Sequence, residues 1–196
     1  PEQNLRRTET PTLGDLRAAL IAICGTDFGA HSPIWLSSFT DMARLAETYR
    51  TGRVLLARDA AHIHSPVGGL GLNTGLQGAV NLGWKVARVV KGVSPDRLLD
   101  SYQFERRPVA ARVLRNALAQ VTLMRLDEHS KAACGAVADL LGMEDGRKAF
   151  GAMMSGLDIC YGLPGGHPLL GRRMPHLELD LGQQTVSTYS LLHAAR

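Results

Sequence analysis

The amino-acid sequence predicts a fold of the α/β class, more narrowly an α+β fragment in which short strands come before a series of helices. Apolar residues recur at helical spacing over most of the chain after residue 70, a short apolar run lies before that region, and an uncharged, glycine-rich segment joins the two. With 196 residues, 45% of them hydrophobic and 20% charged, the chain has enough apolar residues for a core and excludes the disordered and collagen-like classes.

The first part of the chain is predicted to hold one helix and two strands. Residues 13–25 place apolar side chains on one helical face, where we expect Cys24 to pack. Residues 34–39 alternate between apolar and polar side chains, although not strictly, and this pattern predicts a strand. A short polar helix or turn is expected over 41–50. The apolar run 54–57 is bounded by charge on both sides, which is typical of a buried strand.

Two helices are predicted after the glycine-rich segment. The first has Asn73 or Thr74 as a suitable N-cap and ends at Gly92. The second opens at Ser94-Pro95-Asp96, a cap followed by proline at the first helical position. Proline removes a helical hydrogen bond, so we expect a kink or a break at Pro108.

The remaining residues are predicted to form further helices and then a change of composition. Helical periodicity returns over 131–141 and again over 146–160. A run of turn-forming residues over 162–168 reads as a linker. Beyond it, 177–181 alternates as a strand and 188–194 is able to open a helix, but too few residues follow the linker for a self-sufficient domain. We therefore expect a fragment of a longer polypeptide.

The charge and the cysteine content limit which binding partners and which cellular compartment we expect. The formal net charge is +4, but the basic residues are scattered, so a nucleic-acid partner is disfavoured. The three cysteines, Cys24, Cys134 and Cys160, are far apart in the sequence and suggest no disulfide framework, which favours a reducing cytoplasm. The uncharged stretch 60–84 contains proline and six glycines, so we expect no membrane span. His62 and His64 lack a third ligand nearby, so no metal site is predicted.

The glycine-rich segment is the most informative part of the chain. Glycines allow backbone amides to approach a ligand, and the start of the next helix supplies free N–H groups with a partial positive charge. This combination favours an anionic or carbonyl-rich ligand, although the same residues also suit a tight structural turn. No P-loop triplet is present, and Gly69 and Gly71 open a dinucleotide fingerprint whose third position is Thr74. Neither standard phosphate loop fits.

Several segments in order resemble the second FAD motif and its surroundings in class A flavoprotein monooxygenases, the aromatic hydroxylases related to para-hydroxybenzoate hydroxylase. The matching segments are 35–39, 52–62, 66–75, 81–85, 98–102, 105–108 and 167–175. The last of them resembles the entry to the thioredoxin-like domain of the subgroup that acts on polyketides, rifamycins, tetracyclines and phenols.

The resemblance implies a domain organisation. Residues 1–50 are similar to the end of the substrate-binding domain, and 51–161 to the second half of the FAD-binding domain with its C-terminal helices. Residues 162–196 are similar to the start of a truncated thioredoxin-like C-terminal domain.

The resemblance also assigns site residues. Asp59 would accept a hydrogen bond from a ribityl or ribose hydroxyl of FAD, and the loop would lie beside the isoalloxazine ring. Backbone N–H groups at the helix start would face the flavin pyrimidine edge. The implied cofactor-binding residues are Asp59, Pro66, Gly68, Gly69, Gly71, Leu72 and Asn73. Trp35 and Phe39 would contribute to the substrate wall, or pack in a core. No catalytic side chain is identified.

In this family NADPH or NADH reduces FAD, O2 adds to give a flavin C4a-hydroperoxide, and its distal oxygen is transferred to an activated ring. The implied partners are O2 and a small aromatic or polyketide substrate, as in antibiotic biosynthesis, with a homodimer as one assembly to test. The protein would contribute orientation, dryness and proton control.

The sequence also departs from the family pattern. Arg58 stands where the family usually has glycine, Leu70 where glutamine is common, and Gly78 where aspartate is common. The N-terminal dinucleotide fingerprint is absent from these residues. An alternative function is therefore a truncated or decayed, non-catalytic remnant that acts as an interaction module. A third is a flavoprotein that oxidises or reduces without inserting oxygen.

Overall fold

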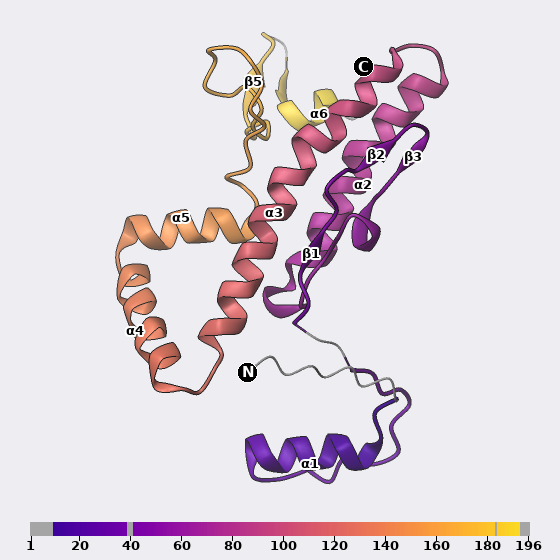
Figure 1. Cartoon of the computed structure of the whole chain (residues 1–196). Helices are drawn as coiled ribbons and strands as arrows, with labels where there is room; N and C mark the ends of the chain where they lie inside the picture. The colour runs from indigo at the N-terminus through magenta and orange to yellow at the C-terminus, as the bar shows by residue number, and fades with distance from the viewer. Residues whose placement is uncertain (1–9, 39–40, 183, 193–196) are drawn as a thin grey trace.

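A computed structural model describes residues 10–38, 41–182 and 184–192. A long antiparallel pair of helices, α2 and α3, forms the body of the molecule (Figure 1). The helices are α1 (Leu13–Cys24), α2 (Leu70–Val90), α3 (Asp100–Leu123), α4 (Glu128–Gly142), α5 (Glu144–Ser155) and α6 (Thr188–Leu192), with the short 3-10 turns η1 (Arg58–Ala60), η2 (Val67–Gly69) and η3 (Asp96–Leu99).

The strands are short and pair only as antiparallel ribbons within the described residues. They are β1 (Arg44–Leu45), β2 (Arg50–Thr51), β3 (Val54–Leu55), β4 (His62–Ile63), β5 (Glu178–Asp180) and β6 (Thr185–Ser187). Strand β1 pairs with β4, β2 with β3, and β5 with β6. In the first ribbon Leu45 lies opposite His62, and in the second Arg50 lies opposite Leu55.

The core lies where the first two ribbons meet α2 and α3. Tyr49, Ala61 and Tyr102 are buried there, and the two tyrosine rings pack with centroids 5.6 Å apart. The hydroxyl of Tyr102 donates to the carbonyl of Leu56 over 3.1 Å, which ties α3 to the chain after β3. Burial raises the pKa of Tyr49 to about 12, so this hydroxyl stays protonated at physiological pH.

Charged contacts join the helices. The ammonium of Lys85, with no exposed surface, lies 2.8 Å from the Glu105 carboxylate, and Asn81 donates to the same oxygen over 2.6 Å. Arg112 binds Asp158 through both of its terminal nitrogens, over 2.7 and 2.9 Å, which fixes the chain just after α5 to α3. Such bidentate pairs have a well-defined geometry.

Local signals explain where α1 and α5 begin and end. Thr12 and Asp15 form a reciprocal capping box at the start of α1, and Gly25 ends it in the left-handed conformation. The prediction of a helix over 13–25 is therefore confirmed. Helix α5 ends at Ser155 because Gly156 is left-handed (φ 73°), so the helix expected over 146–160 is shorter at its C-terminal end.

Two expectations for the N-terminal part are wrong and two hold only in part. Residues 34–38 form no strand, since no neighbouring strand of the described residues pairs with them, and residue 39 lies outside the described residues. The 41–50 segment, expected as a short helix or a turn, holds β1 and bends, so the helix alternative is wrong. The strand predicted at 54–57 is β3, but Val54 is 64% exposed because β3 pairs only with β2 as a hairpin. Cys24 is exposed, not packed.

Two expectations for the long helices also need correction. Helix α2 starts at Leu70, because the left-handed Gly69 leads directly into it, so Thr74 lies inside the helix and donates to the Leu70 carbonyl over 2.8 Å. Helix α3 runs through Pro108 as one element. Pro108 is exposed, so water can hydrogen-bond the Phe104 carbonyl that the proline leaves free.

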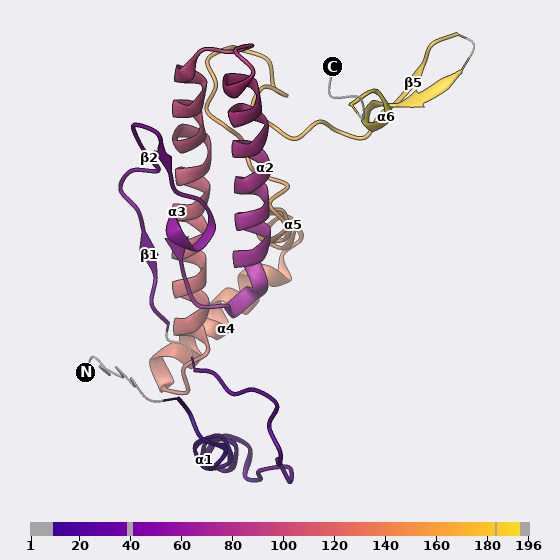
Figure 2. The same ribbon diagram turned by 90° about the vertical axis from the view of Figure 1, so that its right-hand side faces the viewer.

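The terminal parts project from the helical body. Helix α1 has no buried residue and lies beyond the end of the body at which α2 starts, whereas the β5–β6 ribbon and α6 lie at the opposite end (Figure 2). No helix of the described residues is both long and apolar enough to cross a membrane.

Candidate functional site

The glycine-rich segment forms the connection from β4 through η2 into α2. Gly68 and Gly69 both have left-handed backbones, with φ of 78° and 65°. A Cβ on Gly68 would lie 2.6 Å from the side-chain oxygen of Gln120, so the loop sits tightly against α3. At Gly69 a Cβ would meet nothing within 4 Å, so this residue faces open space. The loop is closed by a hydrogen bond from the Gly69 amide to the Pro66 carbonyl over 3.0 Å.

The start of α2 offers backbone donors to this open space. No side chain caps Gly69, and no acidic residue lies in the first turn of α2. An uncapped helix start carries unsatisfied N–H groups and a partial positive charge. The side chains of Leu72 and Asn73, in that turn, are exposed. The arrangement suits a ligand that presents carbonyl oxygens or negative charge.

Asp59 lies on η1, which packs against α2. Its side chain is exposed and makes no hydrogen bond or ion pair in the described part of the chain, so the carboxylate is available as an acceptor. The preceding Arg58 has a left-handed backbone (φ 54°), which is uncommon for a residue other than glycine. Its stem lies across Gly75 of α2: a Cβ on that glycine would be 3.3 Å from the Arg58 Cγ.

Two histidines support the loop from the side of β4. The ring of His64 would lie 3.4 Å from a Cβ on Gly71, and its Nδ1 is 2.7 Å from the Ser65 carbonyl. His62 is 7% exposed, and burial, followed by the neighbouring charges of His64 and Arg106, holds the pKa of its imidazole below the usual range. Neither His62 Nδ1 nor His64 Nε2 has a hydrogen-bond partner among the described residues. His62 is therefore neutral at physiological pH, on the strand that leads into the loop.

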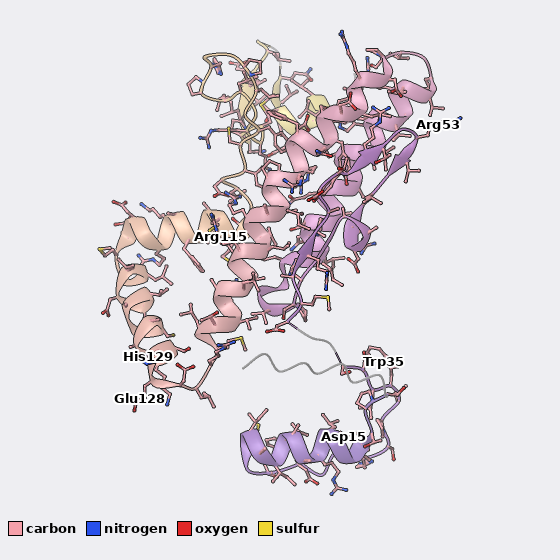
Figure 3. The ribbon with its side chains drawn as sticks, viewed as in Figure 1. Asp15, Trp35, Arg53, Arg115, Glu128 and His129 are labelled. Atoms are coloured by element: carbon pink, nitrogen blue, oxygen red, sulfur yellow. The ribbon has the colours of Figure 1, made fainter. Side chains whose placement is uncertain are left out.

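The residues predicted to bind the cofactor come from η1, from the η2 loop and from the first turn of α2, and η1 packs against α2. The predicted substrate wall is not placed with them. Trp35 is 79% exposed in the segment beside α1 (Figure 3). Phe39 lies outside the described residues. Within the described ranges no group of three or more His, Cys, Asp or Glu side chains is placed to hold a metal ion.

Sequence reasoning missed Arg106. The Glu105-Arg106-Arg107 run is expected on a solvated helix surface, yet Arg106 is only 3% exposed. Its guanidinium donates to Tyr161, to the Thr74 carbonyl and to Gln77, over 3.0, 3.3 and 3.2 Å. Local sequence carries no signal for this burial, because Tyr161 comes 55 residues later.

Comparison with known proteins bears on this site. A family described as FAD binding domain matches residues 2–117. The chain is 50% identical over 184 residues to a 12-dehydrotetracycline 5-monooxygenase/anhydrotetracycline 6-monooxygenase of Streptomyces rimosus, covering 93% of this chain and 36% of that protein. It is 46% identical over 190 residues to a rifampicin monooxygenase of Streptomyces venezuelae, covering 97% of this chain and 39% of the relative.

A solved structure gives the same picture. The OxyS anhydrotetracycline hydroxylase from Streptomyces rimosus superposes with a TM-score of 0.91 and 47% identity, over 97% of this chain and 39% of that one. The predicted fold class, part of a flavin-monooxygenase fold, is thereby confirmed. The chain spans less than two-fifths of the length of each of these three relatives.

Proposed function

Because the chain belongs to the FAD-binding-domain family of class A flavin-dependent aromatic monooxygenases, we propose that its protein hydroxylates an aromatic or polyketide-type substrate, with FAD as cofactor and NADPH or NADH as reductant. The observation that carries this proposal is the uncapped start of α2 behind the left-handed pair Gly68 and Gly69. FAD, when bound, would take up hydride from the reductant and activate O2 for insertion into the substrate.

The residues present fit this cofactor. Gly69 faces open space at the helix start, and the side chain of Asp59 is exposed and unpaired in the described part of the chain. We assign the ribityl or ribose hydroxyl to Asp59. Pro66, Gly68, Gly69 and Gly71 shape the loop beside the flavin ring, and the amides of Leu72 and Asn73 face its pyrimidine edge.

The helix start is suited to control charge at that edge. Backbone N–H groups at a helix N-terminus stabilise negative charge by roughly 0.3–2 kcal/mol. The side chains of Leu72 and Asn73 are exposed, and the amide of Leu72 belongs to the unsatisfied N–H groups of the helix start, which we place toward a ligand on the first turn of α2. No acidic side chain in this turn opposes the effect.

The buried groups beside the loop would keep it dry and in place. His64 fills the space that Gly71 leaves, and His62 stays neutral because burial lowers its pKa. Gln120 of α3 holds the other side of the loop at Gly68. Oxygen-transfer chemistry needs a rigid surface that excludes water beside the cofactor, because water promotes side reactions.

The domain organisation belongs to the same proposal. Residues 1–50 would complete a substrate-binding domain, with Trp35 and Phe39 at the substrate wall, and 51–161 would form the second half of the FAD-binding domain. Residues 162–196 would begin a thioredoxin-like domain. The substrate class, small aromatic or polyketide molecules, is supported by the names of the tetracycline and rifampicin relatives.

The test is oxygen incorporation. The purified protein is incubated with FAD and desalted, its flavin spectrum is recorded, and it then receives NADPH and anhydrotetracycline under 18O2. We expect retained flavin and one 18O atom in the product. NADPH oxidation with no 18O in the product would favour a flavoprotein that does not insert oxygen. A protein that retains no flavin and makes no product would favour the non-catalytic interaction module.

A further inference from the structure

Apart from the glycine loop, a pocket lies between α2, α3 and the chain that follows α5. It has a volume of about 590 Å³, within the range of small-molecule sites. Leu76, Val80 and Trp84 of α2 form one wall. The other lining residues come from the segment 155–173, which folds back on itself through an antiparallel backbone β-bridge between Cys160 and Arg172. No residue of the glycine loop, 66–71, lines this pocket.

The pocket is positively charged. Arg106, Arg172 and Arg173 all line it, and none of its described lining residues carries a carboxylate. Arg106 is 3% exposed, and its three hydrogen bonds go to a phenol, a backbone carbonyl and a side-chain amide. A buried guanidinium with only neutral acceptors keeps its full charge, which favours an anion nearby.

The other two arginines differ in how they are engaged. Arg173 donates to the Tyr189 hydroxyl over 3.1 Å and lies over its ring. The guanidinium of Arg172 has no hydrogen-bond or ion-pair partner in the described ranges. It is therefore free to pair with a carboxylate, whose two oxygens match the guanidinium fork.

The apolar wall selects what the anion is attached to. Leu76, Val80 and Trp84 follow each other at intervals of four residues, so they form one stripe on α2, and they are 60%, 66% and 48% exposed. An indole beside two aliphatic side chains provides a flat surface on which a ring can stack. Cations at one end and a flat apolar wall along the side suit a planar aromatic anion.

We propose that this pocket binds a planar aromatic carboxylate, with its carboxylate on Arg106 and Arg172 and its ring against Trp84. The proposal is independent of flavin binding, because it uses no residue assigned to the cofactor. Guanidinium contacts supply the discrimination between a charged ligand and its neutral analogue.

The test uses 1-naphthoate and its neutral analogue 1-naphthamide. These 196 residues contain two tryptophans, so in this chain Trp35→Phe leaves Trp84 as the indole reporter. We expect saturable quenching by 1-naphthoate, weaker binding of 1-naphthamide by roughly tenfold or more, and a similar loss of 1-naphthoate affinity in Arg106→Gln and in Arg172→Gln. Arg115→Gln is the matched control: Arg115 is an exposed arginine of α3 outside the pocket (Figure 3).

Arg172 is exposed, so Arg172→Gln should fold even where Arg106→Gln does not. Equal affinity for the two naphthalene ligands would overturn the proposal. So would a naphthoate affinity that Arg172→Gln leaves unchanged, since a carboxylate bound elsewhere on the chain would not depend on this side chain.

Discussion

Arg58 has a backbone conformation that L-residues avoid, one residue before the aspartate assigned to the cofactor. Its φ of 54° brings Cβ close to the carbonyl oxygen, at a cost of roughly 1–2 kcal/mol that glycine does not incur. The stem packs over Gly75 of α2, which offsets part of this cost. The family pattern places glycine here, and the backbone conformation gives the physical reason.

This strain predicts an order of stability. Arg58→Gly should be more stable than Arg58→Ala by about 1 kcal/mol in urea unfolding, because both lose the stem and only glycine relieves the backbone. Arg53, an exposed residue without a left-handed backbone, is the matched control (Figure 3). At position 53 the order should reverse, with alanine the more stable. If alanine and glycine were equally stable at position 58, the strain would be refuted.

His62 should make stability depend on pH. Burial lowers the pKa of its imidazole below the usual 6.5, so the unfolded chain takes up a proton at this residue more readily than the folded one. The free energy of unfolding contributed by His62 is therefore fully present above pH 6.5 and falls as the pH drops below that value. The fall ends once the pH is below the folded-state pKa.

To test this, the pH dependence of stability is compared between the original chain and His62→Gln. Denaturant unfolding of both proteins between pH 7.5 and 5 should show a smaller loss of stability in the variant, since the group that takes up the proton is gone. Parallel pH profiles for the two proteins would mean that His62 titrates alike in the folded and unfolded chains.

At the scale of elements, the α2–α3 pair depends on a buried ion pair. Lys85 has no exposed surface and its ammonium contacts Glu105 as an ion pair rather than as an aligned hydrogen bond. Removing one member of a buried pair typically costs about 3–5 kcal/mol, because the other charge is left without compensation.

Lys85→Met should therefore lower the free energy of unfolding by about 3–5 kcal/mol. Adding Glu105→Gln should recover more than half of that loss, since the buried charge disappears while Asn81 keeps an acceptor. The exposed pair of Lys148 with Glu144, one helical turn apart, is the control, and Lys148→Met should cost less than about 1 kcal/mol. A Lys85→Met effect as small as the control would show that the buried pair is not needed.

The helices and the strands β3 and β5 could be predicted from the sequence, but the pairing of the strands into ribbons could not. Periodicity and capping residues are local, so α1, α2 and α4 were predictable to within a few residues at their ends. The strand expected at 34–39 failed because alternation alone does not provide a neighbouring strand to pair with. Pro108 lies in a continuous helix because tertiary packing of α3 outweighs the local propensity.

The same division holds within the site. The glycine loop and Asp59 are contiguous in sequence, so composition and motif identified them. The buried Arg106 is held by Gln77 and Tyr161, from elements 29 residues before and 55 residues after it, and no local pattern reports such contacts. The ring of His64 fills the space next to Gly71, a contact that composition does not reveal.

At the scale of the whole molecule, the described residues contain one side of the proposed flavin site and many exposed apolar side chains. The chain spans 36–39% of the length of the relatives compared. Exposed side chains such as Ile34, Leu72 and Val90 would lose this exposure where other parts of such a protein cover them. FAD binding is therefore tested most directly by a measurement that reports on the loop residues themselves.

The decisive measurement is hydrogen–deuterium exchange of the chain with and without FAD. We expect slower exchange of the amides over 67–73 when FAD is added, because the loop and the first turn of α2 then have an acceptor. Asp59→Ala should reduce this protection at the same FAD concentration, whereas the exposed Asp139→Ala on α4 should not. Exchange over 67–73 that FAD leaves unchanged, or protection equal in both variants, would contradict the assignment of this loop to the cofactor.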